Sequence, residues 1–194
     1  SDGSQDGTIE EVISFSTPQG ISLKVLDNEA HTGKGHAVKS GIMKAGGDEI
    51  LFIDSGNCIP YEHIDRGLEL LKSGVCQIAH ASRYHPQSII TRPKPPLRRL
   101  ASCLFRKLIR IWVSIPRDLR DTQCGLKIYR KEVAHDLYSS CRTTGFMFDA
   151  EIILRAGKKG YRIVEFPVEW RSDPDSRLSP GRTYFSIFRE LARI

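Results

Sequence analysis

The stretch that decides the fold is EILFIDSGNCIP, residues 49–60, in which a run of apolar residues ends at an acidic one. Residues 50–53 are apolar without alternation, which is typical of a strand buried on both faces of a parallel sheet. Asp54 follows at the carboxyl end of this strand, the edge where open α/β sheets bind ligands. Asp54 is therefore a candidate for catalysis or metal binding, and a turn or cap aspartate before the sequence SGN is the alternative.

The segments on either side predict alternating helices and strands. Thr8 and Glu11 have the spacing of a capping box, which predicts a helix over residues 9–16. The other expected elements are a strand at 21–26, a helix after GKG at 33–35, a helix from 60 to a stop at 74, strands at 75–79 and 125–129, a helix at 148–156, a strand at 161–170 and a helix at 182–194. This alternation with short connections predicts an α/β fold, a three-layer α/β/α sandwich around a mostly parallel sheet.

Composition is that of one ordinary globular domain, expected over residues 1–194. The chain is 40% hydrophobic and 27% charged. Five scattered cysteines without a CxxC pair favour reduced thiols in a cytosol-facing protein and argue against a zinc site. No signal peptide is evident, and no apolar run approaches the ~18 residues of a membrane span. Because the chain opens at SDGSQDGT, which has the composition of a loop, we expect a fragment whose first strand is missing.

The positive charge of the chain is local. Residues 92–117 carry eight Lys and Arg and no acid, so the remainder has a net charge of −2 within a total of +6. Such a segment suits the phosphate groups of lipid, nucleotide or nucleic acid. Within it, residues 97–115 predict a basic amphipathic helix whose apolar stripe faces either lipid headgroups or the core. We expect no nucleic acid as partner, because only Phe105 and Trp112 could stack on bases.

Seven motifs occur in a recognisable order: SDGSQDGT, GKGHAVKSG, Asp54 after its strand, ASRY, DTQCGLKIY, FMFDAEII and EFPVEWRSDPDSR. In this order they resemble the family 2 glycosyltransferases of the GT-A fold, and most of all the polyprenyl- and dolichyl-phosphate sugar synthases. The resemblance covers about residues 1–181. It implies a GT-A-like domain and an inverting hexosyltransferase that uses a GDP- or UDP-sugar as donor and a lipid phosphate as acceptor. It further implies a cytoplasmic protein, peripheral on the cytosolic face of a membrane.

The resemblance implies three donor-binding residues. Asp2 corresponds to an acid near the base or ribose, Lys34 to the lysine of the GKG loop beside the diphosphate, and Asp54 to the first acid of an Asp-x-Asp metal motif. The chain departs from this motif at Gly56, which replaces the second acid, and at Cys58, which replaces a further polar ligand. Mg²⁺ or Mn²⁺ with Asp54, phosphate and water as ligands is the expectation. A catalytically impaired relative that binds nucleotide sugar or lipid phosphate without efficient transfer is the alternative.

The resemblance also implies residues around the acceptor. Asp121 corresponds to a catalytic acid that orients groups or assists the metal, because a lipid phosphate is already mostly dianionic at neutral pH. For a hydroxyl acceptor Asp121 would instead be the general base. Four residues match positions that hold the acceptor phosphate or donor diphosphate: Arg83, Arg98, Ser102 and Arg177. Guanidinium groups suit phosphate oxygens because they form paired, charge-assisted hydrogen bonds.

Three further acids belong to these motifs. Asp149 and Glu151 are two residues apart in an expected helix, so only one of them should face the site. Glu165 is expected to be structural. The six histidines show no metal-binding spacing, and we expect His80 to be an ordinary polar or core residue.

Overall fold

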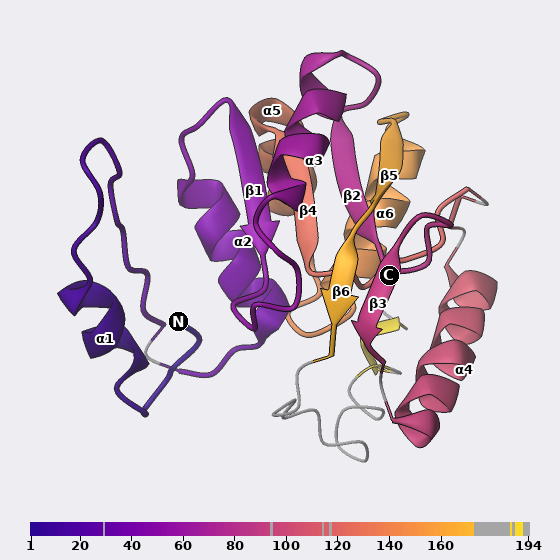
Figure 1. Ribbon diagram of the computed structural model, residues 1–194, viewed down its shortest axis with the longest axis horizontal. Helices are drawn as coiled ribbons and strands as arrows, with labels where there is room; N and C mark the ends of the chain where they lie inside the picture. Colours follow the sequence, from indigo (N-terminus) through magenta and orange to yellow (C-terminus); the bar gives the residue numbers. More distant parts are fainter. Residues whose placement is uncertain are drawn as a thin grey trace.

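The computed structural model describes residues 1–28, 30–93, 95–113, 115–116, 118–172, 187 and 189–191. Its centre is a four-stranded sheet with the strand order β1-β4-β2-β5 (Figure 1). The strands are β1 (Glu49–Ile53), β2 (Ile78–Ser82), β4 (Leu126–Arg130) and β5 (Ile163–Pro167). β2 and β5 are parallel, whereas β4 is antiparallel to both β1 and β2. Three strands therefore share one direction, as predicted, and β4 is the exception.

Helices cover both faces of this sheet. They are α2 (Lys34–Lys44), α3 (His63–Lys72), α5 (Lys131–Ser139) and α6 (Phe148–Lys158). Ile78 and Tyr129 point toward α2, α5 and α6, while the neighbouring Ala79 and Ile128 point toward α3. This alternation is the period of a strand, and it divides the core into two apolar layers. Figure 1 shows α3 in front of the sheet and α5 and α6 behind it, so the predicted three-layer fold is confirmed.

A third group of elements lies beside β5. Helix α4 (Pro96–Trp112) packs its buried Ile109 against Met147 and Ala150. Strands β3 (Ile89–Arg92) and β6 (Glu169–Arg171) form a separate parallel pair. The predicted single strand over 161–170 is therefore two strands, β5 and β6. The predicted strand at 75–79 begins later, at Ile78, and the predicted helix from 60 begins at His63.

The amino-terminal segment differs most from the prediction. Residues 21–26 form no strand, because Ile21 and Leu23 are exposed and none of the described strands pairs with this segment. Helix α1 (Thr8–Ser14) buries no residue and lies away from the sheet in Figure 1. The capping box is also wrong: the cap is Gly7 in the left-handed conformation, and the Thr8 hydroxyl donates to Asp6. Of the helix predicted at 182–194, residues 187 and 189–191 are helical, and the others lie outside the described residues.

Gly67 lets α3 approach the sheet closely. A Cβ atom at this position would lie 2.6 Å from Cδ1 of Ile128 and 3.0 Å from Cε1 of Phe166. We expect Gly67→Ala to lower the free energy of unfolding by about 1–3 kcal/mol, because the buried side chains of Ile128 and Phe166 would have to move to admit the methyl group. Urea denaturation measures this change. Gly157→Ala in α6 is the matched control, since nothing lies within 4 Å of its added Cβ and alanine favours a helix. Equal effects of the two substitutions would contradict the packing argument.

Candidate active site

One edge of the sheet collects the predicted acids. The carboxyl ends of β1, β2 and β5 meet the amino end of β4 there, because Ile53 pairs with Leu126 and Ser82 pairs with Pro167. Asp54 directly follows β1, Arg83 directly follows β2, and Asp121 lies in the loop that enters β4. Since β4 is antiparallel, the loop before it, rather than the loop after it, reaches this edge.

Asp121 and Arg83 form a buried ion pair. The Nε and Nη2 groups of Arg83 donate to the two carboxylate oxygens over 2.7 and 2.8 Å, and the Arg83 backbone N–H donates over 3.0 Å. The Asp121 side chain is 1% exposed. Burial alone would raise the pKa of Asp121, but the charge and hydrogen bonds of Arg83 outweigh it and hold the pKa well below its ordinary value. A carboxylate so engaged is a poor proton acceptor, which favours the orienting role over general-base catalysis.

Glu165 fixes the loop that carries Asp121. Its carboxylate accepts the backbone N–H groups of Arg120 and Asp121 over 2.9 and 2.7 Å. Burial raises the pKa of Glu165, and these two hydrogen bonds oppose that rise. Asp121 then accepts the backbone N–H of Gln123 over 3.1 Å. The structural role expected for Glu165 is therefore to link β5 to the loop before β4.

A second ion pair, between Lys34 and Asp54, is open to solvent. The Lys34 Nζ lies 2.7 Å from Oδ1 of Asp54, and the two side chains are 32% and 41% exposed. The Asp54 backbone N–H donates to the carbonyl of Gly125 over 2.8 Å. A Cβ atom at Gly125 would overlap the Asp54 carboxylate, so only glycine fits behind it. Asp54 therefore rests on the same loop that carries Asp121.

The loop before Lys34 is shaped by Asp2. The Asp2 carboxylate accepts the backbone N–H groups of Thr32 and Gly33 over 2.9 and 2.8 Å and pairs with His31. Burial raises the pKa of Asp2, but these hydrogen bonds outweigh it and the pKa is lowered. Gly33 has a φ of 120°, and a Cβ there would lie 2.5 Å from the carbonyl oxygen of Thr144. Asp2 thus holds the loop that positions Lys34 at the start of α2.

A buried pair, Lys127 and Asp149, lies beneath the open one and was missed by sequence reasoning. Their charged atoms are 2.5 Å apart, and Lys127 also donates to the Cys124 carbonyl over 2.7 Å. Both lysines lie near the ring of Phe52, whose centroid is 5.5 Å from Lys34 Nζ and 5.6 Å from Lys127 Nζ. Burial raises the pKa of Asp149, against the charge of Lys127. The available signal was a lysine at an inward position of the strand LKIYR.

Glu151 has a different role from Asp149. Its carboxylate accepts the backbone N–H groups of Arg142 and Thr143 and pairs with Arg155. Hydrogen bonds of this kind hold the connection between α5 and α6. The expectation that only one acid of the FDAEI motif faces the site agrees with these contacts, and that acid is Asp149.

The predicted acceptor residues are less closely gathered. Arg98 is exposed in the first turn of α4, and Ser102 is half-buried one turn later. Arg177 lies outside the described residues. Of the predicted phosphate ligands that the structure describes, Arg83 is the one in direct contact with Asp121.

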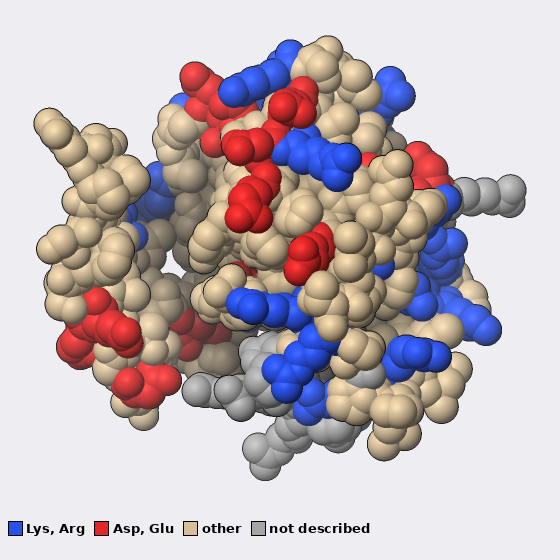
Figure 2. Space-filling model, viewed as in Figure 1, with Lys and Arg blue, Asp and Glu red and all other residues tan. Residues whose placement is uncertain are grey.

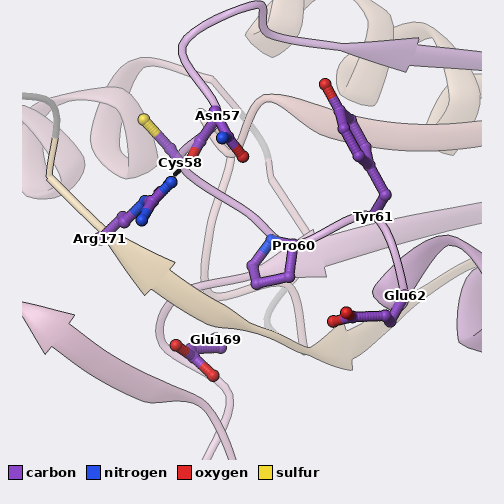
Figure 3. Close-up of a pocket in the computed structure, with 7 residues that line it drawn as sticks. All are labelled: Asn57, Cys58, Pro60, Tyr61, Glu62, Glu169 and Arg171. Atoms are coloured by element: carbon purple, nitrogen blue, oxygen red, sulfur yellow. Dashed lines mark hydrogen bonds between the residues drawn. The ribbon is translucent and has the colours of Figure 1, made fainter.

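A shallow pocket opens beside the loop that follows β1 (Figure 3). Its volume is about 330 Å³, and its lining residues are Asn57, Cys58, Pro60, Tyr61, Glu62, Glu169 and Arg171. Arg171 holds the loop in place, because its Nε donates to the Asn57 carbonyl and its backbone N–H donates to the Cys58 carbonyl, both over 3.0 Å. Cys58 therefore lines this pocket, and its thiol contacts the Gly56 carbonyl at 3.5 Å.

Metal ligands are sparse in the described part of the chain. No group of three or more His, Cys, Asp and Glu residues is arranged there to hold an ion. Asp54 can supply one hard oxygen ligand, because its carboxylate is partly exposed. The remaining positions around Mg²⁺ or Mn²⁺ would fall to phosphate oxygens and water.

Helix α4 presents an exposed apolar stripe. Leu97, Leu100, Leu104 and Ile111 are 79%, 58%, 58% and 80% exposed, and their spacing places them on one side of the helix. The adjoining Trp112 is 61% exposed. Figure 2 shows Lys and Arg side chains gathered over the region where α4 lies in Figure 1. The sequence left open whether the apolar stripe faces lipid headgroups or the core, and the core alternative is wrong for these five side chains.

The sequence model described as Glycosyl transferase family 2 matches residues 1–138. The chain belongs to glycosyl transferase family 2. Dolichyl-phosphate beta-glucosyltransferase of Drosophila melanogaster is 29% identical over 200 residues, which cover 100% of this chain and 61% of that protein. The human protein of the same description is 28% identical, and the match covers 98% of this chain and 60% of the human protein. Glycosyltransferase AglD of Haloferax volcanii is 26% identical, and the match covers 99% of this chain and 30% of that protein. The chain thus spans less than two thirds of the length of these relatives.

Solved structures of a glucosyl-3-phosphoglycerate synthase share the fold. Glucosyl-3-phosphoglycerate synthase of Mycobacterium tuberculosis, in complex with Mn²⁺, UDP-glucose and phosphoglyceric acid, superposes with a TM-score of 0.60 at 16% identity. The match covers 82% of this chain and 52% of that one. The same protein in complex with UDP gives a TM-score of 0.56 at 17% identity. The GT-A fold predicted from the sequence is therefore confirmed.

The buried pair of this family 2 domain makes stability depend on pH. We expect Asp121→Asn to lower the free energy of unfolding by about 3–5 kcal/mol at pH 7, because the charge of Arg83 would lose its partner. The pKa of Asp121 is lowered in the folded state, so its contribution is present above about pH 4, its ordinary pKa, and is lost as the pH falls further. The difference between parent and variant, measured by urea denaturation, should shrink below about pH 4.

The control for this prediction is Asp118→Asn, which removes an exposed carboxylate from the same loop. It should change stability by less than about 0.5 kcal/mol. A difference between parent and Asp121→Asn that stays constant from neutral to strongly acidic pH would refute the link to this ion pair.

Proposed function

We propose that this family 2 domain transfers a hexose from a GDP- or UDP-sugar to a polyprenyl or dolichyl phosphate at a membrane surface. The observation that carries the proposal is one sheet edge with both the open Lys34–Asp54 pair and the buried Arg83–Asp121 pair. Relatives described as dolichyl-phosphate beta-glucosyltransferases match the whole chain. UDP-glucose is the first donor to test, because a structure with the same fold holds it.

The donor diphosphate is assigned to the open pair. Lys34 begins α2, so a diphosphate beside it would meet both the ammonium group and the positive end of the helix dipole. The Asp54 carboxylate would then leave Lys34 and act as one ligand of a divalent cation. When bound, such a cation supplies positive charge to the departing diphosphate. Gly56 offers no second carboxylate, so the proposed dependence on the metal is shallow.

The acceptor needs no strong base. A phosphate monoester has its second pKa near ~6 and is mostly dianionic at neutral pH. One of its oxygens attacks the anomeric carbon directly, the bond from that carbon to the donor diphosphate breaks, and the configuration inverts. Asp121 stays ionised throughout, and its role is to hold the Arg83 guanidinium in place. The low pKa of Asp121 supports this division of roles.

The exposed stripe of α4 supports action at a membrane surface. Apolar side chains at this position would enter the headgroup region of a bilayer, and Arg99, Lys107 and Arg110 beside them would meet anionic lipid. Each such basic residue contributes about 1 kcal/mol near an anionic surface. No helix in the described ranges is long and apolar enough to cross a bilayer. Anionic lipid is enriched in the cytoplasmic leaflet, which supports the cytosolic face as the proposed location.

A transfer assay tests the function and the metal together. The parent should move glucose from UDP-glucose to a polyprenyl phosphate, and Asp54→Ala should reduce transfer at least about tenfold, because the cation that neutralises the diphosphate would lose its one carboxylate ligand. Gly56→Asp should tighten Mn²⁺ binding in the presence of UDP-glucose at least about fivefold, since it adds a second hard ligand. Calorimetric titration measures this affinity.

Two outcomes would count against this proposal. A parent that binds UDP-glucose but transfers nothing with any nucleotide sugar would support the impaired relative, which Gly56 and Cys58 favour. Unchanged Mn²⁺ affinity in Gly56→Asp would remove Asp54 from the proposed metal shell. Glu62→Gln, in the exposed loop after β1, controls for a general effect of charge near this edge.

Vesicle binding tests the membrane surface. Replacement of Leu104 and Trp112 by Gln should weaken binding to phosphatidylglycerol vesicles at least about tenfold, because both side chains lose apolar burial. High salt should weaken the binding of the parent by screening its basic residues. Arg98→Met should raise the apparent KM for lipid phosphate with little change in vesicle binding. Co-sedimentation measures these affinities, with Ile21→Gln, an exposed apolar site far from α4 in sequence, as the control.

A further inference from the structure

Arg106 reaches from α4 to the site edge. Its Cζ lies 3.6 Å from the ring centroid of Tyr84, the second residue after β2. Arg83 lies beside the same ring, with its Cζ 5.8 Å from the Tyr84 centroid and 5.5 Å from that of Trp170. Two guanidinium groups from different parts of the chain therefore gather around one aromatic ring.

Stacking on Tyr84 leaves the N–H groups of Arg106 available to bind another partner. A guanidinium stacks through its face, whereas its N–H groups point outward along its edge. The Nε of Arg106 is buried and makes no hydrogen bond with the described residues. Within that same part of the chain, no Asp or Glu forms an ion pair with it. A buried donor without a partner is destabilising, and an oxygen-rich ligand here would supply the missing hydrogen bond.

The charge around Tyr84 favours an anion. The charge of Arg83 is balanced by its buried carboxylate partner, but that of Arg106 is not balanced within the described residues. The loop after β2 is in a positive field: burial lowers the pKa of His85, and the charges of Arg120 and Arg66 lower it further. Residues 92–117, which include Arg106, contain no acid.

We propose that Arg106 binds the phosphate monoester of the lipid acceptor, with Tyr84 as the platform that fixes its guanidinium. The assignment rests on the proposed function and adds a specificity residue that the sequence motifs did not indicate. Arg106 lies one turn after Ser102 on the same face of α4, and Ser102 is one of the residues expected to hold phosphate.

Binding of geranyl phosphate, a short isoprenyl phosphate, tests the assignment by calorimetry. Arg106→Met should weaken it at least about tenfold, because charge-assisted hydrogen bonds to the phosphate are lost. Arg106→Lys should restore only part of the affinity, since a lysine keeps the charge without the planar stack. Tyr84→Leu should also weaken binding by releasing the guanidinium. Arg162→Met is the matched control and should bind as the parent does, because Arg162 is exposed at the opposite end of β5.

Three further ligands identify the source of the phosphate. Geraniol should not bind, inorganic phosphate should bind more weakly than geranyl phosphate, and UDP should bind parent and Arg106→Met equally. Denaturation curves establish that each variant is folded. A folded Arg106→Met with unchanged affinity for geranyl phosphate would overturn the assignment. If Arg106→Met lost affinity for UDP as much as for geranyl phosphate, Arg106 would belong to the donor site and the assignment would be overturned. Inorganic phosphate that binds as tightly as geranyl phosphate would also overturn it.

The transfer assay separates this inference from the proposed function. A parent that binds geranyl phosphate through Arg106 but moves no sugar would refute the function and support the phosphate site. If the parent and Arg106→Met transfer glucose equally well at subsaturating acceptor concentration, the phosphate site is refuted and the proposed function stands.

Discussion

The buried ion pair between Asp121 and Arg83 is the interaction on which the site depends. It joins the end of β2 to the loop before β4, and Glu165 joins that loop to β5. The pair is stable only because the two guanidinium donors and the two carboxylate oxygens match so closely; burying two such charges without that match would cost several kcal/mol. Because the protein's own groups form this arrangement, binding of a ligand need not order this part of the site.

The fold was predicted where local pattern and tertiary position agree. The apolar run before Asp54 identified β1, and its place in the sheet follows from the same burial. The failures have physical reasons. Residues 21–26 alternate like a strand but have no neighbouring strand to pair with. Helix α5 was missed because it begins at Lys131, directly after β4, without a turn signal. Strand β3 was missed because all four of its residues are exposed.

The sequence predicted which residues belong to the candidate site better than it predicted which of them contact one another. The motifs selected Asp54, Lys34, Asp121 and Arg83, but a sequence does not say that the four would pair with one another. Burial of Lys127 depends on Asp149, a residue from a distant helix, so no local pattern could assign the pair. Each of these contacts joins segments far apart in the chain. Residue type gave the chemistry, and tertiary packing determined which partner each residue meets.

The contrast between the two ion pairs of this edge has a consequence for ionic strength. Mobile ions reach the half-exposed Lys34–Asp54 pair but are excluded from the enclosed Arg83–Asp121 pair. Screening by salt acts on the first and leaves the second nearly untouched. One half of the edge therefore responds to the surrounding electrolyte while the other keeps its geometry. The salt concentration of a buffer thus becomes a means of adjusting the first region without disturbing its neighbour in the same domain.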